Sequence, residues 1–308
     1  MPHRSHPRPE RPSPRRRSHL PDEFRGALRM LEGALARKAL NEPHLPRHHG
    51  ATHAPGHVSG HAPGGLIVAS YNIHKCVGVD KRFDPVRTAA VIAELDADVV
   101  ALQEADRRFG HRTGLLDMEA IERRTGLVLV PVSETPGGHG WRGNVLLVRH
   151  GTTTSIRRLA LPGAEPRGAV VVELDLPAGP LRVVAAHLGL LRRHRALQAA
   201  AILAAITAAE PMPTLLLGDL NEWRPSIPSS LSVLEPLFGP FGHPQPSFPS
   251  RLPFLALDRI LGHPRGLVAG PLVHDSPLAR VASDHLPLRA RIDLSAAQER
   301  VAAWVSAA

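Results

Sequence analysis

The sequence predicts an α/β protein in which two packed sheets are covered by helices. Segments with strand-like and helix-like patterns of apolar residues are mixed along residues 65–293. Between residues 127 and 188, several strand-like segments follow one another with only short turns between them. Consecutive strands of this kind favour two packed sheets over a strictly alternating barrel.

The elements are expected in a definite order along the chain. Asp84 and Pro85 predict a helix start, because aspartate caps the first turn and proline suits the first helical position. Gly126 predicts the end of a second helix. Helices are therefore expected at 86–95, 118–125, 195–210 and 294–308. Strands are expected at 66–72, 97–104, 127–132, 143–150, 152–161, 168–176, 181–188, 213–219, 257–262 and 287–294.

Three regions differ in composition. Residues 1–64 form a basic, Pro- and His-rich extension with one amphipathic helix at about 21–41, residues 65–293 form the main domain, and 294–308 form a C-terminal helix. The extension holds eleven Lys or Arg and five Asp or Glu, which is +6 of the chain's net charge of +9. Its helix is expected to pack on the domain or on a partner. Contact of the basic extension with a membrane surface or with nucleic acid stays open.

Several classes of protein are disfavoured by the composition. No apolar stretch reaches the roughly 18 residues that a membrane span needs, so no transmembrane segment is expected. The first residues have no apolar core of a secretory signal. Cys76 is the single cysteine, which excludes an internal disulfide framework and fits a cytoplasmic location.

Six short polar motifs stand at the ends of predicted strands or begin the last one. They are Asn72, Gln103–Glu104, His187, Gly218–Asn221, Asp258 and Ser283–His285. A strand end is where a fold can present a fixed polar group. Carboxylates, amides and imidazoles without a cysteine indicate a site for a hard cation and for phosphate chemistry.

Glu104 is the strongest candidate for a metal ligand. It follows a run of apolar residues, and a carboxylate in such a place is rarely buried unless it is paired or bound to metal. An ion pair with a nearby arginine is the alternative. Asp219 and Asn221 lie two residues apart, so in an extended backbone they point to one side. Gly218 before them allows the backbone to bend or to approach a ligand closely.

The two histidines need different arguments. His187 ends an apolar strand, where a histidine is more often structural than catalytic. Asp284 and His285 point to opposite sides of an extended chain, so one can bind metal while the other meets a phosphate if a third group orients the imidazole. Asp258 is the candidate for that third group.

The segment WRGN offers two further polar side chains. Arg142 and Asn144 open a predicted strand and are candidates for phosphate binding. A salt bridge or a turn hydrogen bond is the alternative for both.

The order of these motifs resembles the endonuclease/exonuclease/phosphatase superfamily, to which deoxyribonuclease I belongs. The matching pieces are S-Y-N, L-Q-E, H-L, G-D-x-N, D-R-I and S-D-H, spread over about residues 65–293. The stretches WRGNVLL and HLGLLRRHRALQAAAI are most similar to small, stand-alone bacterial metal-dependent hydrolases. The resemblance implies a four-layer α/β/β/α sandwich of two packed mixed sheets flanked by helices.

The resemblance also implies a metal site. Glu104 would be the principal ligand of Mg²⁺ or Mn²⁺, with Asn72 and Asp284 assisting.

Roles in catalysis follow from the same resemblance. Asp219 and Asn221 would hold and orient the attacking water and the phosphate. His285, oriented by Asp258, would contact the phosphate and stabilise the charge that develops there. His187 would be a second phosphate-facing imidazole or a general acid.

The expected activity is therefore hydrolysis of a phosphodiester or a phosphomonoester by in-line attack of an activated water. The substrate could be a lipid head group, a nucleic acid or a small phosphodiester. One alternative is a DNA endonuclease of the same superfamily, although an aromatic content of 4% offers few platforms for base stacking. Another is a catalytically silent binding or scaffold protein. The presence of a polar residue at every expected position argues against this alternative.

Overall fold

The computed structural model describes residues 65–107, 112–224, 229–241 and 244–307. The N-terminal extension, with its expected helix at 21–41, lies outside the described residues. The strands are β1 (Gly65–Asn72), β2 (Val99–Gln103), β3 (Val128–Leu129), β4 (Val145–Val148), β5 (Thr152–Ala160), β6 (Gly168–Leu176), β7 (Gly179–His187), β8 (Thr214–Asp219), β9 (Asp258–His263), β10 (Leu272–Val273) and β11 (Leu288–Asp293). The helices are η1 (His74–Cys76), α2 (Pro85–Glu94), α3 (Met118–Thr125), α4 (Arg192–Thr207), η2 (Ser232–Leu234), α5 (Glu235–Phe238), α6 (Ala279–Ala282) and α7 (Leu294–Ala307).

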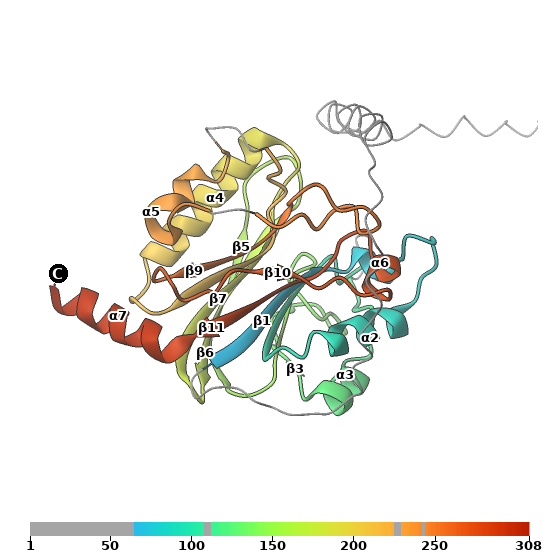
Figure 1. The fold of residues 1–308 in the computed structure, drawn as a ribbon, viewed down its shortest axis with the longest axis horizontal. Coiled ribbons are helices and arrows are strands. Elements are labelled where there is room, and N and C mark those ends of the chain that lie inside the picture. Colours follow the sequence, from blue (N-terminus) through green and yellow to red (C-terminus); the bar gives the residue numbers. More distant parts are fainter. Residues whose placement is uncertain (1–64, 108–111, 225–228, 242–243, 308) are drawn as a thin grey trace, which may run out of the picture. The chain divides into compact units, whose positions relative to one another are not determined.

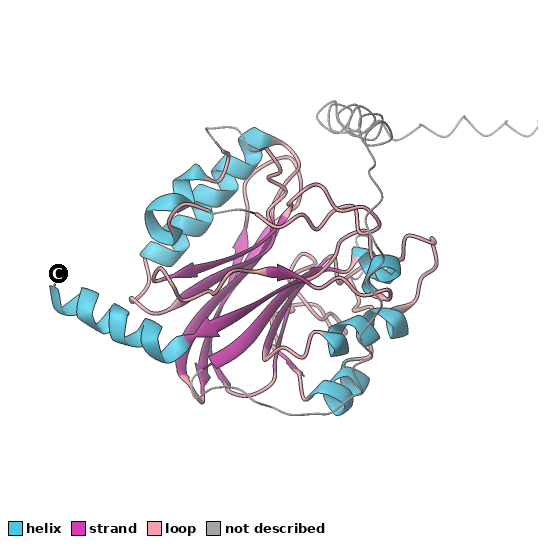
Figure 2. Ribbon diagram, in the orientation of Figure 1, coloured by secondary structure: helices cyan, strands magenta, loops and turns pink. Residues whose placement is uncertain are grey.

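The strands form two mixed sheets that lie face to face (Figure 1). One sheet has the order β10-β11-β1-β2-β4-β3, and the other has the order β5-β6-β7-β8-β9. Each sheet contains one parallel pair, β1 with β2 and β7 with β8, and its remaining pairs are antiparallel. Figure 2 shows the strands of both sheets gathered in the centre, with the helices outside them.

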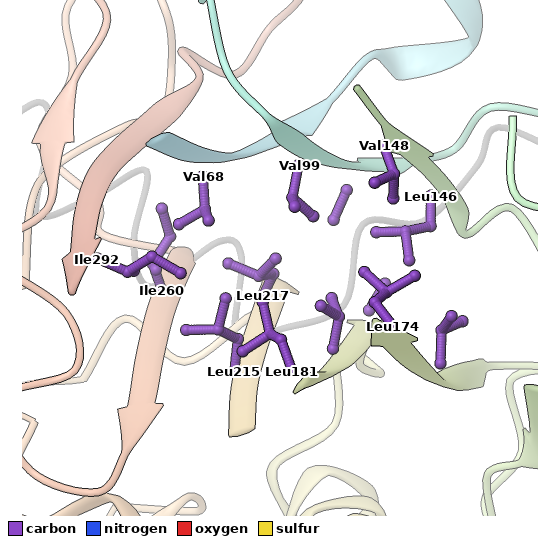
Figure 3. Close-up of a cluster of buried hydrophobic side chains, with 14 of the residues drawn as sticks. Val68, Val99, Leu146, Val148, Leu174, Leu181, Leu215, Leu217, Ile260 and Ile292 are labelled. Carbon is purple, nitrogen blue, oxygen red and sulfur yellow. The ribbon is translucent and has the colours of Figure 1, made fainter. Parts of the chain in front are cut away.

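The main hydrophobic core lies between the two sheets. Val68 and Val99 of one sheet face Leu217 and Leu181 of the other, and all four are fully buried (Figure 3). Successive side chains of a strand point to opposite faces, so Ala69, the neighbour of Val68, belongs to a different cluster.

Helices cover the outer face of each sheet. The outer cluster of the six-stranded sheet includes buried residues of α2, α3 and α6, and the outer cluster of the five-stranded sheet includes buried residues of α4, η2 and α5. Figure 1 shows these two groups of helices on opposite sides of the sheets. The predicted four-layer α/β/β/α sandwich is confirmed.

The local signals in the sequence have visible causes in the structure. The side chain of Asp84 accepts a hydrogen bond from the backbone N–H of Arg87 at 2.9 Å, which caps α2. Gly126 ends α3 in a left-handed conformation, with φ at 73°. The strand expected at 127–132 is shorter than predicted, because only Val128 and Leu129 pair with β4.

The C-terminal helix continues directly from β11. In α7 the side chain of Gln298 donates a hydrogen bond to the carbonyl of Ala178 at 3.1 Å, which ties the helix to the turn between β6 and β7. Among the described residues, no helix has the length and apolar character needed to cross a membrane.

Gly218 in β8 is required by the close approach of two strands. Its φ is +148°, and a Cβ atom built there would lie 1.8 Å from the carbonyl oxygen of Ala186 on β7. From the sequence, Gly218 was expected to allow either a bend or a close approach to a ligand. In the structure, the close approach of Gly218 is to Ala186 on the neighbouring strand β7.

We expect Gly218→Ala to lower the free energy of unfolding by more than about 2 kcal/mol, because the new Cβ meets backbone and the conformation disfavours L-residues. Gly270→Ala is the matched control, since no atom lies within 4 Å of its Cβ position, and it should change stability by less than about 1 kcal/mol. Urea denaturation of the three proteins measures both effects. Equal stability of the two variants would contradict the close-approach explanation.

Candidate active site

The strand register brings five of the six motifs to one edge of the sandwich. Asn72 ends β1 beside Gln103, the last residue of the parallel strand β2. His187 ends β7 beside Asp219, the last residue of the parallel strand β8. Asp258, the first residue of the antiparallel strand β9, pairs with Asp219 on its other side. Strand pairing alone therefore sets the backbone positions of these residues, whatever contacts their side chains make.

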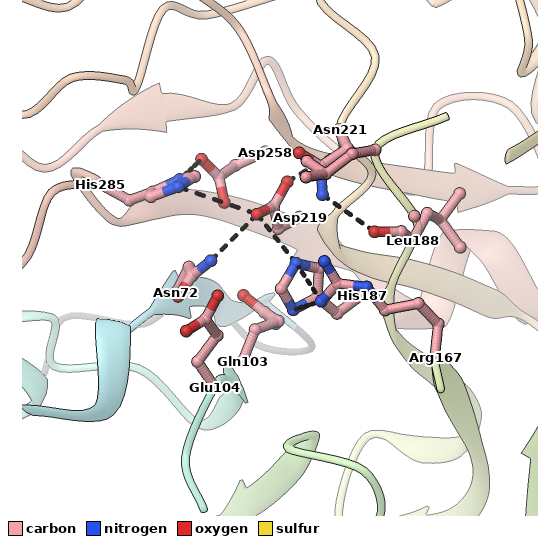
Figure 4. Close-up of polar contacts among 12 residues, drawn as sticks. Asn72, Gln103, Glu104, Arg167, His187, Leu188, Asp219, Asn221, Asp258 and His285 are labelled. Atoms are coloured by element: carbon pink, nitrogen blue, oxygen red, sulfur yellow. Dashed lines mark hydrogen bonds and ion pairs between the residues drawn. The ribbon is translucent and has the colours of Figure 1, made fainter. Parts of the chain in front are cut away.

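The carboxylate of Asp219 lies at the centre of the site (Figure 4). Its side chain is almost completely buried, and its Oδ2 atom accepts a hydrogen bond from the amide of Asn72 at 3.0 Å. The same oxygen lies 3.4 Å from Nε2 of His187 and 3.8 Å from Nε2 of His285. One oxygen thus faces groups from both sheets.

His285 is held and charged by Asp258. Its Nδ1 atom lies 2.8 Å from Oδ2 of Asp258, which also accepts a hydrogen bond from the hydroxyl of Ser247 at 2.5 Å. Burial alone would lower the pKa of His285, but the carboxylates of Asp258 and Asp219 outweigh it and raise the pKa to about 10. The imidazole is therefore protonated at neutral pH. The contact expected between Asp258 and His285 is present, and its role in catalysis stays a prediction.

His187 is in the opposite protonation state. Burial and the neighbouring Arg167 lower its pKa to about 3, and the carboxylate of Asp219 offsets only part of this effect. One guanidinium nitrogen of Arg167 lies 2.9 Å from Nδ1 and 2.8 Å from Nε2 of the ring. The ring is therefore neutral at neutral pH, which suits a hydrogen-bonding role better than that of a general acid.

Asn221 is not placed as the sequence predicted. β8 ends at Asp219, and Asn221 has a φ of 53° instead of an extended backbone. Its backbone N–H donates to Oδ1 of Asp219 at 3.0 Å, and its side-chain amide donates to the carbonyl of Leu188 at 2.9 Å. The expectation that Asp219 and Asn221 point to one side of an extended strand was wrong. The hydrogen bond from the Asn221 N–H to the Asp219 carboxylate closes a turn, and this turn bends the chain.

Glu104 follows β2 in a left-handed conformation, with φ at 55°. Its carboxylate makes an ion pair with the ammonium of Lys75, and the Glu104 side chain is 22% exposed. The alternative to metal binding was an ion pair with an arginine, whereas the described partner is a lysine. Metal binding by Glu104 stays a prediction. Lys75 also has a positive φ of 57°, and its N–H donates to the carbonyl of Glu104 at 3.2 Å.

Asn72 and Asp284 lie on either side of His74. The amide oxygen of Asn72 accepts the backbone N–H of His74 at 3.1 Å. The Oδ1 atom of Asp284 lies 3.7 Å from the His74 imidazole, and the Asp284 side chain is one-third exposed. The hydroxyl of Ser283 donates to the backbone carbonyl of Asn72 at 2.7 Å, which ties the two segments together.

Two groups of side chains are candidates for a metal. The ligand atoms of Asp219, Asp258 and His285 lie within 4.8 Å of one another. We regard this cluster as a hydrogen-bonded network, because Nδ1 of His285 lies 2.8 Å from Oδ2 of Asp258, which also accepts the hydroxyl of Ser247.

The other candidate is the group predicted from the sequence. Glu104, Asp284 and the amide oxygen of Asn72 are hard oxygen ligands, and Lys75 already places a positive charge against Glu104. The single cysteine, Cys76, is buried in the core and offers no competing soft ligand. The residues present therefore fit a divalent cation such as Mg²⁺ or Mn²⁺.

Arg142 and Asn144 lie in the turn before β4. Asn144 is fully buried, and its amide donates to the backbone carbonyls of Trp141 and Gly168 at 3.2 and 2.9 Å. The contacts of Asn144 therefore match the alternative of a turn hydrogen bond. Arg142 lines a pocket beside Glu104 and His187, where an anion would meet it.

Sequence reasoning did not single out several residues of the site. Lys75 stands three residues after Asn72, but its positive φ, which turns it back to Glu104, leaves no pattern in the sequence. Arg167 and Ser247 lie in connecting segments, where apolar periodicity gives no information.

The charge of His285 leads to a pH-dependent prediction for the metal-free protein. Its pKa in the folded state lies above the unfolded value of about 6.5, so its contribution to stability is complete below pH 6.5. That contribution is lost as the pH rises through about 10. In Asp258→Asn the pKa should fall, and unfolding free energy should decrease less between pH 6.5 and 10 than in the wild type. NMR titration of the imidazole together with urea denaturation measures this, and an unchanged pKa would refute the pairing.

Comparison with known proteins agrees with this arrangement of fold and site. The uncharacterized protein YbhP of Escherichia coli is 29% identical over 247 residues, which cover 74% of this chain and 96% of YbhP. An endonuclease/exonuclease/phosphatase from Beutenbergia cavernae superposes with a TM-score of 0.56 at 25% identity, over 76% of this chain and 72% of that one. TDP2 of D. rerio, whose structure holds a single-stranded DNA product, superposes with a TM-score of 0.54 at 15% identity, over 74% and 98% of the two chains.

The family model that matches the chain covers most of the main domain. The model of the endonuclease/exonuclease/phosphatase family matches residues 69–285, which include all six motifs. Members of this family are generally hydrolases of phosphate esters and generally depend on a divalent metal. The chain therefore belongs to the endonuclease/exonuclease/phosphatase family.

Proposed function

We propose that the protein is a divalent-metal-dependent phosphoesterase that hydrolyses a phosphodiester, or a phosphomonoester, by in-line attack of a water molecule. The observation that carries the proposal is the pair of imidazoles that face one carboxylate oxygen of Asp219. One imidazole is charged and the other is neutral. A site that separates the pKa values of two like groups is typical of catalysis, because each group then has a distinct task.

In the proposed mechanism, the three oxygen ligands Glu104, Asn72 and Asp284 would hold the cation. When bound, Mg²⁺ or Mn²⁺ supplies Lewis-acid stabilisation of the phosphoryl transition state. The proposal also includes a cytoplasmic location, which rests on the single, buried cysteine.

The remaining steps belong to side chains of the central network. Asp219 accepts a hydrogen bond from the attacking water, orients it and takes up the proton that the water loses as its oxygen bonds to phosphorus. The bond from phosphorus to the ester oxygen breaks on the opposite side, and the released oxygen takes a proton from solvent or leaves as an anion. Asn221 fixes the carboxylate of Asp219 through its backbone N–H and thereby positions that water. Oδ2 of Asp219 is well placed to orient the water, since it lies beside the imidazoles of His187 and His285, which contact the phosphate.

The two histidines contact the phosphate. His285, charged and oriented by Asp258, donates a charge-assisted hydrogen bond from Nε2 to the phosphoryl oxygen on which negative charge develops. His187 remains neutral beside Arg167 and provides a second, uncharged hydrogen bond. The two contacts hold the phosphoryl group in line with the water.

The first test concerns the metal. Glu104→Gln keeps the shape of the side chain but removes the charge that a hard cation needs, so hydrolysis of bis-p-nitrophenyl phosphate and p-nitrophenyl phosphate should be abolished. Calorimetric titration with Mg²⁺ and Mn²⁺ should show weaker binding, and circular dichroism should show an intact fold. Glu119→Gln, at an exposed position of α3, is the matched control and should behave like the wild type. Full activity of Glu104→Gln at saturating Mg²⁺ would disprove its role.

The second test concerns the charged imidazole. His285→Ala should lower kcat about 10²-fold to 10³-fold, because it removes an electrostatic stabiliser of the transition state. Asp258→Asn should lower kcat less, since the imidazole remains but loses the carboxylate that orients it and favours its protonation. Steady-state kinetics on the best substrate, with melting curves for each variant, makes the comparison. A larger loss in Asp258→Asn than in His285→Ala would contradict the assigned order of roles.

A further inference from the structure

A basic pocket lies beside the reacting groups. It is open to solvent and is lined by Lys75, Glu104, Asp106, Arg112, Arg142, Gly143, Pro166, Arg167 and His187. Glu104 and His187 are among its lining residues, whereas Asp219, Asp258 and His285 are not. The pocket therefore shares His187 with the central network and Glu104 with the candidate metal ligands.

The lining carries an excess of positive charge. Four basic side chains stand against the two carboxylates of Glu104 and Asp106. Arg112 pairs with Asp106 at 3.2 Å, and Arg167 pairs with Glu165 at 2.9 Å. Among the described residues, the lining contains no Phe, Tyr or Trp, so a base or an acyl chain finds little to pack against.

Arg142 is the cation of this lining that has no carboxylate partner among the described residues. One of its five N–H groups donates to the backbone carbonyl of Arg167 at 2.9 Å. Its guanidinium carbon lies 5.3 Å from the ring centre of Trp141. Among the described residues, the guanidinium makes the one hydrogen bond to Arg167, so its remaining donors are left for a ligand. A planar guanidinium with donors to spare suits bidentate binding of a phosphate.

The turn that carries Arg142 is braced in an unfavourable conformation. Arg142 has a φ of 48°, although non-glycine residues seldom adopt positive values. Trp141 and Asn144 exchange two backbone hydrogen bonds of 2.9 and 3.0 Å around it, and the Asn144 amide reaches to Gly168. A Cβ atom at Gly168 would lie 2.9 Å from Cδ of Arg142, so this glycine leaves room for the arginine stem. Local strain held by such bracing is typical of a preorganised binding residue.

We propose that this pocket is the subsite for a second phosphate group of the substrate, with Arg142 as its main ligand. The inference rests on the proposed function and narrows its substrate class to phosphodiesters that carry another phosphate near the scissile one. A terminal phosphate carries a charge of about −1.5 to −2 near pH 7, which suits a lining in which Arg142 has no carboxylate partner among the described residues. A quaternary ammonium head group would be repelled there. The second phosphate can come from a nucleotide or from a phosphorylated polyol head group.

The test uses two matched pairs of substrates. The first pair is thymidine 5′-(p-nitrophenyl phosphate) with and without a 3′-phosphate, and the second is inositol 1-(p-nitrophenyl phosphate) with and without a 4-phosphate. Both members of a pair have the same scissile bond and leaving group. The ratio of their kcat/KM values therefore measures only the contribution of the second phosphate. The pair with the larger ratio identifies the source of that phosphate.

We expect the full-length wild type to prefer the second phosphate about 10-fold or more in at least one pair, because charge-assisted hydrogen bonds to phosphate are strong. Arg142→Gln should reduce the ratio below about threefold, and Arg142→Lys should give an intermediate ratio, since it keeps the charge but loses the fork. Arg123→Gln on α3 is the matched control, because it removes the same charge at an exposed position and should leave the ratio unchanged.

A second readout does not require turnover. In metal-free buffer of constant ionic strength, inorganic pyrophosphate should raise the Tm of the wild type more than inorganic phosphate does. Arg142→Gln should lose most of this difference, and Arg123→Gln should keep it. Binding to the native state raises Tm by mass action, so the shift reports occupancy of the pocket.

The outcomes separate the two proposals. If no phosphate ester is hydrolysed but the pyrophosphate shift depends on Arg142, the proposed function is wrong and the anion subsite stands. If hydrolysis is metal-dependent but Arg142→Gln keeps the preference and the shift, the subsite is wrong and the proposed function stands. An equal loss of preference in Arg123→Gln would also overturn the subsite, since general electrostatics would then explain it.

Discussion

The site depends on one buried carboxylate that needs partners from both sheets. A buried anion is costly unless it is paired, and Asp219 on β8 finds its partners in Asn72 of the opposite sheet and in two imidazoles. These contacts form only if the two sheets keep their relative position. The apolar core between the sheets sets that position, so packing far from the edge determines the polar geometry at the edge.

His187 and His285 both lie beside Oδ2 of Asp219, but each imidazole has a different charged neighbour on its other side. His285 has a carboxylate, Asp258, at 2.8 Å, whereas His187 has the guanidinium of Arg167 at the same range. The charges of these neighbours have opposite effects on the pKa of each ring. The difference between a charged and a neutral donor thus originates in groups that stand behind the imidazoles, not in Asp219 itself.

The sequence predicted those parts of the site that strand pairing determines. Polar residues at the ends of apolar runs could be brought together without knowledge of side-chain contacts, which is why Asp258 was assigned to His285 correctly as a neighbour. Asn221 was misplaced because a local turn overrides extended geometry. Lys75 and Arg167 were missed because loop conformation decides their direction, and loops carry no periodic signal.

The left-handed backbone of Glu104 has a consequence for how such a chain would change over generations. A glutamate with φ at 55° costs about 1 kcal/mol relative to a glycine, which adopts this conformation freely. Under the proposed function, selection for activity would have to maintain the residue against that gain in stability. A duplicated copy released from such selection should drift toward glycine at position 104 and become more stable as it does. The residue at this single position would then distinguish a working copy from a retired one.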